Sequence, residues 1–240
     1  MISVILPTYN EKDNIVLLID SISKVLNEIG DVDYEIIVVD DNSPDGTSIL
    51  VSEFIKNHTI KNSNKTKLIT RVKERGLGTA IKTGIENSNG EYIIIMDTDF
   101  SHPPEFITEL IKTIKKLDCD TVIASRYIKG GEMIAPKYKY FLSKIFNLII
   151  MKILNIQIRD LTGGFFIIKK SLLNKINFEK VFLGYGDYFY RLFYELKKVN
   201  FSFKEIPFKY EKRKTGESKT NTLKMGIDYI KTIFLLLFKK

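Results

Sequence analysis

The 240-residue sequence has few of the residues that build disulfides and transition-metal sites. It contains one cysteine, Cys119, and two histidines, His58 and His102. A single cysteine excludes an intrachain disulfide and a multi-cysteine zinc site, and two histidines argue against a histidine-rich metal site. A hard cation with oxygen ligands remains compatible with this composition.

Long uninterrupted apolar runs are also missing. The segments 141–158 and 226–240 are mostly apolar, but polar or charged residues interrupt both. Neither supplies the roughly 20 apolar residues of a transmembrane helix. Each is compatible with a buried helix or with a lysine-edged helix lying on an anionic membrane, and we expect the second for residues 221–240. The first apolar stretch, "ISVILPTYN", lacks a basic segment before it and a cleavage site, so no signal peptide is expected.

The chain carries an excess of basic residues, with a formal net charge of +8. Such an excess favours anionic partners such as nucleotides, phospholipids or nucleic acid. The basic residues are not interleaved with aromatic residues in the manner of RNA-recognition modules, so nucleic acid is not an expected partner.

Short apolar segments alternate with helical patterns through the first half of the chain. The β-branched segments 2–6, 34–40, 67–71, 91–97 and 120–125 predict strands buried on both faces. Helical spacing of apolar residues is clearest over 15–29 and 106–117. This order predicts an α/β domain over 1–220, with a Rossmann-like, mostly parallel sheet and helices on both faces. Its ligand should lie beyond the carboxyl ends of the strands.

Acidic residues follow several of these strands. The blocks "PTYNE", "DDNSPDG", "DTDFSH" and "SRY" come at four strand ends, which a doubly wound sheet brings to one edge. Taken alone, "DDNSPDG" is also an ordinary turn. Together the blocks are expected to place five acids in one cleft: Glu11, Asp40, Asp41, Asp97 and Asp99.

Asp97 and Asp99 alternate along a strand end, so both carboxylates can converge on one divalent ion. Carboxylates suit Mg²⁺ or Mn²⁺, which in turn bind phosphate oxygens. Ser101 or His102 could complete the shell of such an ion.

Three other functions can be compared with this pattern. The same triplet resembles the start of haloacid-dehalogenase-like phosphatases, in which the first Asp is a nucleophile, although that family carries it on its first strand. Dinucleotide binding through "GLGTAIKTG" is not supported, because Ile81 stands where the third glycine belongs. A non-catalytic basic module that binds anionic surfaces is the third alternative.

The ordered blocks "VILPTYNEKDNI", "EIIVVDDNSPDGT", "RGLGTAIKTGI", "MDTDFSHPPE" and "SRYIKGG" resemble family two glycosyltransferases with the A-type fold. The later "RDLTGGFFIIKK" and "EIPFKYEKRKTGESK" are similar to blocks of one subgroup, the dolichol-phosphate mannose synthases and related polyprenyl-phosphate glycosyltransferases. The resemblance covers about residues 2–220. The chain departs from it at Tyr190, where several relatives carry an acid, and at Gly186, where some carry lysine.

The resemblance implies a role for each matching residue. The nucleotide sugar would be held by Pro7, Tyr9, Glu11, Val39, Asp40, Asp41, Asp97, Thr98, Arg126, Arg213 and Lys219. The acceptor phosphate would be held by Ser125, Arg126 and Lys139. The metal would be held by Asp97 and Asp99, with Ser101 at the third position of the metal site. The catalytic residues would be Asp99, Arg126 and Arg213.

The implied reaction transfers a hexose from a nucleotide sugar to a polyprenyl or dolichyl phosphate, with Mg²⁺ or Mn²⁺ as cofactor. The expected donor is GDP-mannose, which supplies mannose, and the alternative is a UDP donor that supplies glucose. Because a phosphate monoester is largely ionised at neutral pH, we expect direct inverting displacement without a covalent enzyme intermediate. The enzyme is expected to be a peripheral protein at the cytoplasmic face of a membrane. It would either resemble the compact relatives that have no multi-helix membrane domain or depend on a partner subunit for anchoring. The segment 216–221 is expected to close over the donor phosphates.

Overall fold

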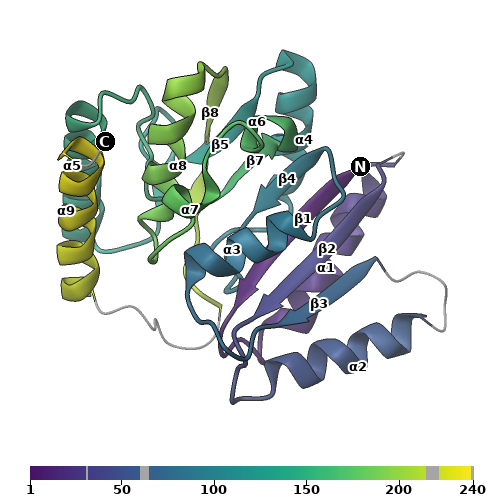
Figure 1. Ribbon diagram of the computed structural model, residues 1–240. Helices are drawn as coiled ribbons and strands as arrows, with labels where there is room; N and C mark the ends of the chain where they lie inside the picture. The colour runs from purple at the N-terminus through teal and green to yellow at the C-terminus, as the bar shows by residue number, and fades with distance from the viewer. Residues whose placement is uncertain (31, 60–64, 215–221, 239–240) are drawn as a thin grey trace.

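The computed structural model describes residues 1–30, 32–59, 65–214 and 222–238. Within them a seven-stranded sheet with the order β3-β2-β1-β4-β7-β5-β8 forms the centre of the molecule (Figure 1). Its strands are β1 (Ile2–Thr8), β2 (Tyr34–Asp40), β3 (Thr66–Thr70), β4 (Tyr92–Ile95), β5 (Thr121–Ser125), β7 (Phe166–Lys169) and β8 (Phe203–Pro207). A separate pair is formed by β6 (Glu132–Met133) and β9 (Lys209–Tyr210).

The five predicted strands are confirmed, and they are parallel wherever they pair with one another. The strand β7 was not predicted. It inserts between β4 and β5 and runs antiparallel to both. The sheet is therefore mixed at this point, and a late segment of the chain lies between two of the strand ends that carry acidic or basic residues.

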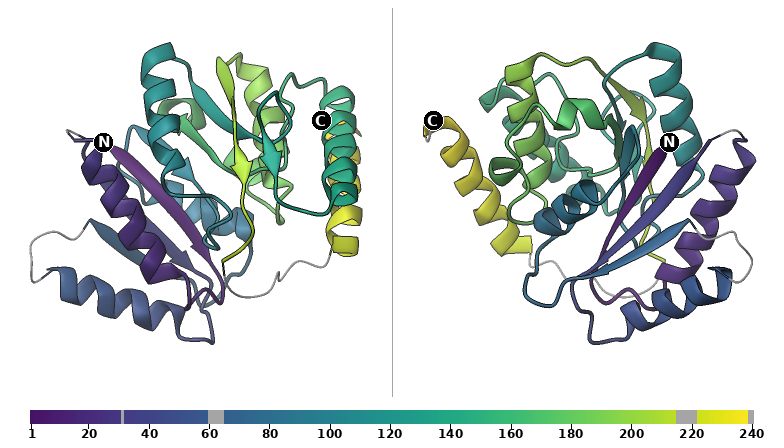
Figure 2. Two further views of the ribbon diagram at one scale, coloured as in Figure 1. Left: turned by 180° about the vertical axis from the view of Figure 1, so that it is seen from behind. Right: turned by 45° about the vertical axis from the view of Figure 1, so that its right-hand side comes forward.

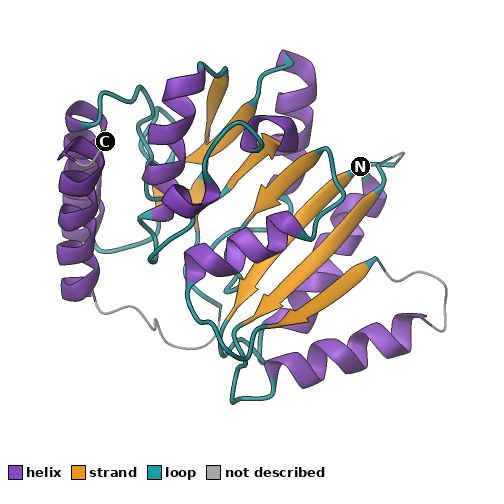
Figure 3. Ribbon diagram, in the orientation of Figure 1, coloured by secondary structure: helices purple, strands orange, loops and turns teal. Residues whose placement is uncertain are grey.

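Helices cover both faces of the sheet (Figure 3). They are α1 (Ile15–Glu28), α2 (Thr47–Thr59), α3 (Leu77–Glu86), α4 (Phe106–Leu117), α5 (Lys137–Ile153), α6 (Lys170–Leu173), α7 (Phe178–Val181), α8 (Tyr188–Leu196), the 3₁₀ turn η1 (Lys197–Val199) and α9 (Thr222–Phe238). The buried side chains of α1, α2 and α4 pack in one apolar cluster, and those of α3, α5, α6, α7, α8 and α9 pack in a second cluster on the opposite face.

The amphipathic spacing of α4 shows why these helices form where they do. Ile107, Leu110, Ile111 and Ile114 are all buried at helical spacing, while Lys115 lies on the exposed side. Apolar stripes of this kind bury their surface against the sheet and supply most of the stability of a helix in a protein.

The helices α5 and α9 lie side by side at one end of the molecule, as the view from behind also shows (Figure 2, left). The rings of Phe146 on α5 and Tyr229 on α9 stack with their centroids 5.7 Å apart. The outward sides of both helices are rich in exposed apolar side chains, so the segment around 141–158 is not simply a buried helix. Among the described residues, none of the helices combines the length and apolar character that crossing a membrane requires.

Candidate functional site

A cavity of about 340 Å³ opens at the carboxyl edge of the sheet, where the sequence places the acidic blocks. We call it the first cavity. Its walls come from the ends of β1, β2 and β4, from the start of α3 and from the segments 183–187 and 211–214. The described lining residues are Pro7, Thr8, Tyr9, Glu11, Asp41, Arg75, Gly76, Leu77, Ala80, Asp97, Thr98, Asp99, Tyr185 and Arg213.

Asp41 joins two walls of the first cavity. Its Oδ1 accepts a hydrogen bond from Arg71 Nε at 2.7 Å, and its Oδ2 accepts one from the backbone N–H of Gly76 at 2.7 Å. The carboxylate thus holds the start of α3 against the end of β2. Both Asp41 and Arg71 are buried, which makes the pair part of the frame of the cavity.

Two residues at the end of β2 that the resemblance assigned to the nucleotide sugar do not line the cavity. Asp40 is fully buried, and its carboxylate accepts hydrogen bonds from the backbone N–H of Ser43 at 2.9 Å and from the Ser43 hydroxyl at 2.5 Å. It therefore stabilises the turn that follows β2. Val39 is fully buried and packs in a small apolar cluster with Ile37 and Ala80.

Arg213 neutralises two of the acids that do line the cavity. Its Nη2 lies 2.9 Å from Asp99 Oδ2, and its Nη1 donates to Glu11 Oε1 at 3.2 Å. The backbone N–H of Lys214 donates to the carbonyl of Asp99 at 3.0 Å, which fixes the segment that carries Arg213 against the end of β4. Residues more than 100 positions apart in the sequence thereby meet in one ionic cluster.

Ser101 fixes the carboxylate of Asp99 through two hydrogen bonds. Its backbone N–H and its hydroxyl donate to Asp99 Oδ1 at 2.9 and 2.5 Å, and the residue is 1% exposed. In this structure Ser101 does not line the cavity, although it was predicted as a metal ligand.

Asp97 has a different environment from Asp99. Burial among the cavity walls, followed by the negative charge of Asp99, raises the pKa of Asp97 from its ordinary value of 3.8 to about 7. The nearest imidazole offers no counter-charge, because burial lowers the pKa of His102 to about 4 and leaves it neutral at pH 7. His102 Nδ1 accepts the backbone N–H of Asp97 at 2.9 Å, which assigns the ring proton to Nε2, 3.8 Å from Asp97 Oδ2.

This donor set fits a divalent cation whose shell is completed by a substrate. Two carboxylates, Asp97 and Asp99, face the first cavity, and the described residues contain no group of three or more acidic, histidine or cysteine side chains that would enclose a metal by themselves. Mg²⁺ is commonly held in this way, by one or two carboxylates together with phosphate oxygens. The raised pKa of Asp97 also shows that burial and the charge of Asp99 outweigh the positive charges of Arg213 and Arg126 at this carboxylate.

A second cavity, of about 600 Å³, lies on the other side of the same acids. Its apolar walls come from α5, α8 and α9, and its polar walls include Arg126, Lys139 and Ser143. Five of the described residues line both cavities: Leu77, Asp97, Asp99, Tyr185 and Arg213. The two cavities therefore meet at the acidic pair.

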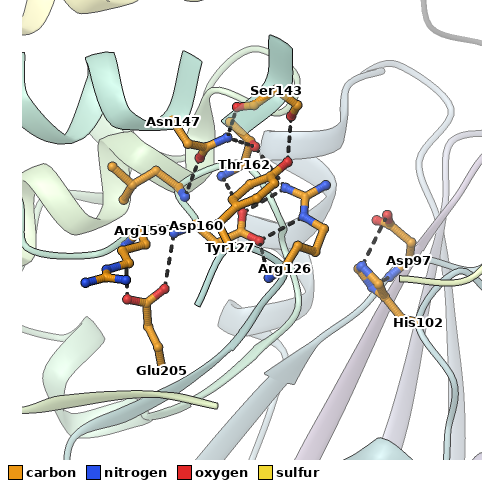
Figure 4. Close-up of polar contacts among 11 residues, drawn as sticks. Asp97, His102, Arg126, Tyr127, Ser143, Asn147, Arg159, Asp160, Thr162 and Glu205 are labelled. Carbon is orange, nitrogen blue, oxygen red and sulfur yellow. Dashed lines mark hydrogen bonds and ion pairs between the residues drawn. The ribbon is translucent and has the colours of Figure 1, made fainter. Parts of the chain in front are cut away.

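Arg126 is held at the second cavity by a buried carboxylate (Figure 4). Its Nε and Nη2 donate to the two oxygens of Asp160 at 2.8 and 2.7 Å, and Nη2 also donates to the Thr162 hydroxyl at 2.9 Å. Burial by itself lowers the pKa of a guanidinium, but the charge of Asp160 and its hydrogen bonds reverse the effect and raise the pKa of Arg126. A fixed positive charge of this kind suits an anionic ligand.

The remaining predicted acceptor residues are divided. Lys139, on α5, is exposed and lines the second cavity. Ser125 is fully buried at the end of β5 and does not line it. Lys219 and the segment 216–221 lie outside the described residues.

Arg75 and Tyr185 are among the lining residues that were not assigned a role from the sequence. Arg75 lies over the ring of Tyr9, with its guanidinium carbon 4.3 Å from the ring centroid. Tyr185 lies between two glycines in "GYGDYFYRL". Arg75 begins the block "RGLGTAIKTGI", which carries the resemblance, and Tyr185 precedes Gly186, where the chain departs from it. Glycines next to an Arg or Tyr were the available signal that the backbone approaches a ligand there.

Known proteins share the sequence pattern and the fold of this chain. The family model described as glycosyl transferase family 2 matches residues 3–177. The chain is 35% identical over 242 residues to a dolichol-phosphate mannosyltransferase of Pyrococcus furiosus, covering 98% of this chain and 63% of that protein. It is 30% identical over 222 residues to a polyprenol monophosphomannose synthase of Mycolicibacterium smegmatis, covering 90% of this chain and 79% of that protein. The chain thus spans just under two thirds of the length of the first of these relatives.

Among solved structures, the fold is similar to that of glucosyl-3-phosphoglycerate synthase from Mycobacterium tuberculosis, crystallised with Mn²⁺, uridine diphosphate and phosphoglyceric acid. The TM-score is 0.70 at 16% identity, over 99% of this chain and 77% of that chain. At this identity the likeness shows the fold, a mostly parallel sheet with helices on both faces, as the sequence predicted.

Proposed function

The chain belongs to glycosyl transferase family 2, and from that premise we propose that it transfers a hexose from a nucleotide sugar to a polyprenyl phosphate at a membrane surface. The first cavity binds the nucleotide sugar and the second binds the phosphate end of the lipid. Mannose from GDP-mannose is the proposed donor group, and Mg²⁺ or Mn²⁺ is the proposed cofactor.

One observation carries this proposal: the two cavities meet at Asp97, Asp99 and Arg213. Group transfer requires donor and acceptor to reach each other in one place. The walls at the meeting point carry the charges that a diphosphate and its cation need, and the outer walls of the second cavity are apolar, as a lipid requires.

The charges at the junction suit the departure of a nucleoside diphosphate. A divalent cation on Asp97 and Asp99 acts as a Lewis acid towards the diphosphate when it is bound. Arg213, held between Asp99 and Glu11, stabilises the negative charge that develops on the departing phosphate. These groups are already oriented by ion pairs, so little reorganisation is needed during the reaction.

The acceptor side needs a fixed cation more than a general base. A phosphate monoester has a second pKa of about 6 and is largely ionised at neutral pH. Arg126, oriented by Asp160, and Lys139 position that phosphate for attack on the sugar C1 from the side opposite the leaving diphosphate. The expected product is β-linked when the donor is α-linked.

The membrane assignment rests on α5 and α9. Both helices border the second cavity, and both expose apolar side chains on their outward sides. Those exposed by at least 37% are Tyr138, Phe141, Leu142, Ile145, Leu148, Ile149, Ile153, Ile227, Ile230, Phe234, Leu235, Leu237 and Phe238. Exposed Lys139, Lys152 and Lys231 lie among them, a combination that suits the interface of an anionic bilayer. A lipid phosphate in that interface would reach the second cavity along Tyr138 and Leu142.

The donor is proposed from the names of the relatives, which are mannosyltransferases, whereas the structural neighbour binds uridine diphosphate. A panel of radiolabelled GDP- and UDP-hexoses, incubated with the protein, Mn²⁺ and a polyprenyl phosphate, separates these donors. We expect label in the organic phase from GDP-mannose. Label from UDP-glucose alone would replace the donor, and no organic-phase label from any donor would refute the proposed transfer.

A further inference from the structure

The junction between the two cavities contains an aromatic residue with no assigned role. Of the five residues that line both cavities, Asp97, Asp99 and Arg213 are charged, and the other two are Leu77 and Tyr185. This inference rests on the proposed function. If that function holds, the transferred hexose occupies the junction while the bond from its C1 to the nucleoside diphosphate breaks and a bond from C1 to the acceptor phosphate forms. The described part of the junction thus offers the sugar ring two uncharged walls.

Tyr185 has the chemistry that a pyranose needs. It is 48% exposed and faces both cavities. An aromatic ring offers an apolar face to the C–H groups of a sugar, and the phenol hydroxyl hydrogen-bonds to its polar groups. Leu77 can supply only apolar contact.

The loop that carries Tyr185 is fixed to the start of α3. The N–H of Gly78 donates to the carbonyl of Gly184 at 3.3 Å. A Cβ at position 78 would lie 2.7 Å from the carbonyl oxygen of Leu183, so glycine is required for this approach. The contact places Tyr185 beside Leu77, on the wall of the first cavity.

A buried carboxylate holds the same loop from the other side. The backbone N–H of Tyr185 donates to Asp187 Oδ1 at 2.8 Å. The other oxygen, Oδ2, accepts hydrogen bonds from Arg191 Nε at 2.8 Å and from the Thr232 hydroxyl at 2.9 Å. Arg191 Nη2 donates to that hydroxyl at 2.7 Å, so the three side chains form a closed network.

This network connects α9 to the sugar position. Thr232 is 3% exposed and lies on α9 (Thr222–Phe238), whereas Asp187 and Arg191 belong to the start of α8. A second contact acts in the same place, since a Cβ at Gly186 would lie 2.0 Å from the hydroxyl of Tyr229 on α9. The position of Tyr185 therefore depends on how α9 is seated.

We propose that Tyr185 contacts the transferred hexose and determines which hexose is accepted, and that Asp187 and Thr232 act as positioning residues that hold it at the junction. The network makes the helix assigned to the membrane surface a structural support of the sugar subsite.

Isothermal titration calorimetry in the presence of Mn²⁺ tests the contact. It compares the affinity of the protein for GDP-mannose with that for GDP, and its affinity for UDP-glucose with that for UDP. Tyr185→Ala is expected to weaken nucleotide-sugar binding about five- to tenfold and to leave nucleoside-diphosphate binding unchanged. It is also expected to narrow the kcat/KM preference between GDP-mannose and GDP-glucose. The sugar contact would be refuted if Tyr185→Ala bound the nucleotide sugar and the nucleoside diphosphate as wild type does, or if it lost affinity equally for the two ligands. Wild-type protein that binds no nucleotide sugar would overturn the proposed function itself, and the inference with it.

Thr232→Val tests the positioning role, because valine has the same shape and lacks the hydroxyl. It is expected to reproduce the selective loss of nucleotide-sugar affinity and to raise the donor KM more than it lowers kcat. Thr113→Val is the matched control, a half-buried threonine on α4 at the opposite face of the sheet. A Thr232→Val protein with wild-type selectivity and affinity would overturn the positioning role, and so would an equal effect of Thr113→Val.

Discussion

At the scale of single residues, Asp97 and Asp99 lie two positions apart and have different electrostatic surroundings. Asp99 is paired with Arg213 and accepts two hydrogen bonds from Ser101. At Asp97, burial and the charge of Asp99 outweigh the charges of Arg213 and Arg126. The imidazole of His102, 3.8 Å from its Oδ2, is neutral at pH 7 because the pKa of His102 is lowered to about 4. The pair therefore holds one neutralised carboxylate and one that is costly to ionise until a cation arrives.

This cost predicts how the stability of the metal-free protein depends on pH. The pKa of Asp97 is about 7 in the folded protein against 3.8 ordinarily, so between these values the folded state holds a proton that the unfolded chain has lost. The free energy of unfolding should fall as pH rises from about 4 to 7, relative to Asp97→Asn. Because the side chain is 43% exposed, solvent screening limits the gain from the substitution at pH 8 to on the order of 1 kcal/mol.

Chemical denaturation in EDTA at pH 5 and pH 8 measures this difference. The control is Asp13→Asn, an exposed acid before α1. A stability difference between wild type and Asp97→Asn that does not grow with pH would contradict the environment described for Asp97.

At the scale of elements, the antiparallel insertion of β7 builds the acceptor side. The connection from α5 to β7 passes Asp160 beneath the end of β5, where it meets Arg126. Asp160 is fully buried and accepts from the backbone N–H, Nε and Nη2 of Arg126. One ion pair thus joins a strand end to the segment that precedes the next strand in the sheet.

Removing one partner of this pair should be costly. Asp160→Ala leaves a buried guanidinium without its counter-charge and is expected to lower the free energy of unfolding by about 3–5 kcal/mol. The double variant Arg126→Met, Asp160→Leu replaces the pair with apolar groups and should recover most of that loss. Urea denaturation measures stability and the organic-phase assay measures transfer. We expect the double variant to be stable and inactive, whereas a stable and active double variant would remove Arg126 from the mechanism.

The outward side of α9 makes a separate prediction. Ile230 and Phe234 are 51% and 58% exposed and lie on one stripe of the helix. If this stripe enters the membrane interface, the double substitution Ile230→Glu, Phe234→Glu should weaken binding to anionic vesicles at least about tenfold, because two apolar contacts are lost and two negative charges are added. Sedimentation with vesicles measures this.

The control for α9 is Ile49→Glu, which replaces a side chain that is 63% exposed on α2, at the other end of the molecule. It should bind vesicles like wild type. Equal binding by all three proteins would place the membrane contact elsewhere.

At the scale of the whole molecule, the parts that the sequence predicted are those that local patterns encode. The alternation of buried strands and amphipathic helices predicted the α/β sheet, and the rule that parallel strands end at one edge brought Glu11, Asp41, Asp97 and Asp99 together. The same rule placed Asp40 in the cleft incorrectly, because it does not distinguish a side chain that faces the ligand from one that caps the next turn.

The features that the sequence did not predict depend on long-range pairing. The position of β7 follows from its pairing with β4 and β5, which are separated from it by about 40 residues or more. The resemblance assigned Arg213 and Glu11 to the nucleotide sugar but did not predict their contact, which spans 202 positions. The network of Asp187 and Thr232 spans 45 positions. Single-sequence periodicity contains no information on such partners.

The central claim is that sugar transfer takes place at the Asp97–Asp99 junction between the two cavities. The most direct test is the rate at which label from GDP-mannose enters the organic phase with polyprenyl phosphate and Mn²⁺, for wild type and for Asp99→Asn. The substitution preserves the shape of the side chain and removes its charge. We therefore predict a folded protein whose rate of mannose transfer is lower than that of wild type by a factor of about 100 or more. Asp99→Asn that transfers mannose at the wild-type rate would contradict the account.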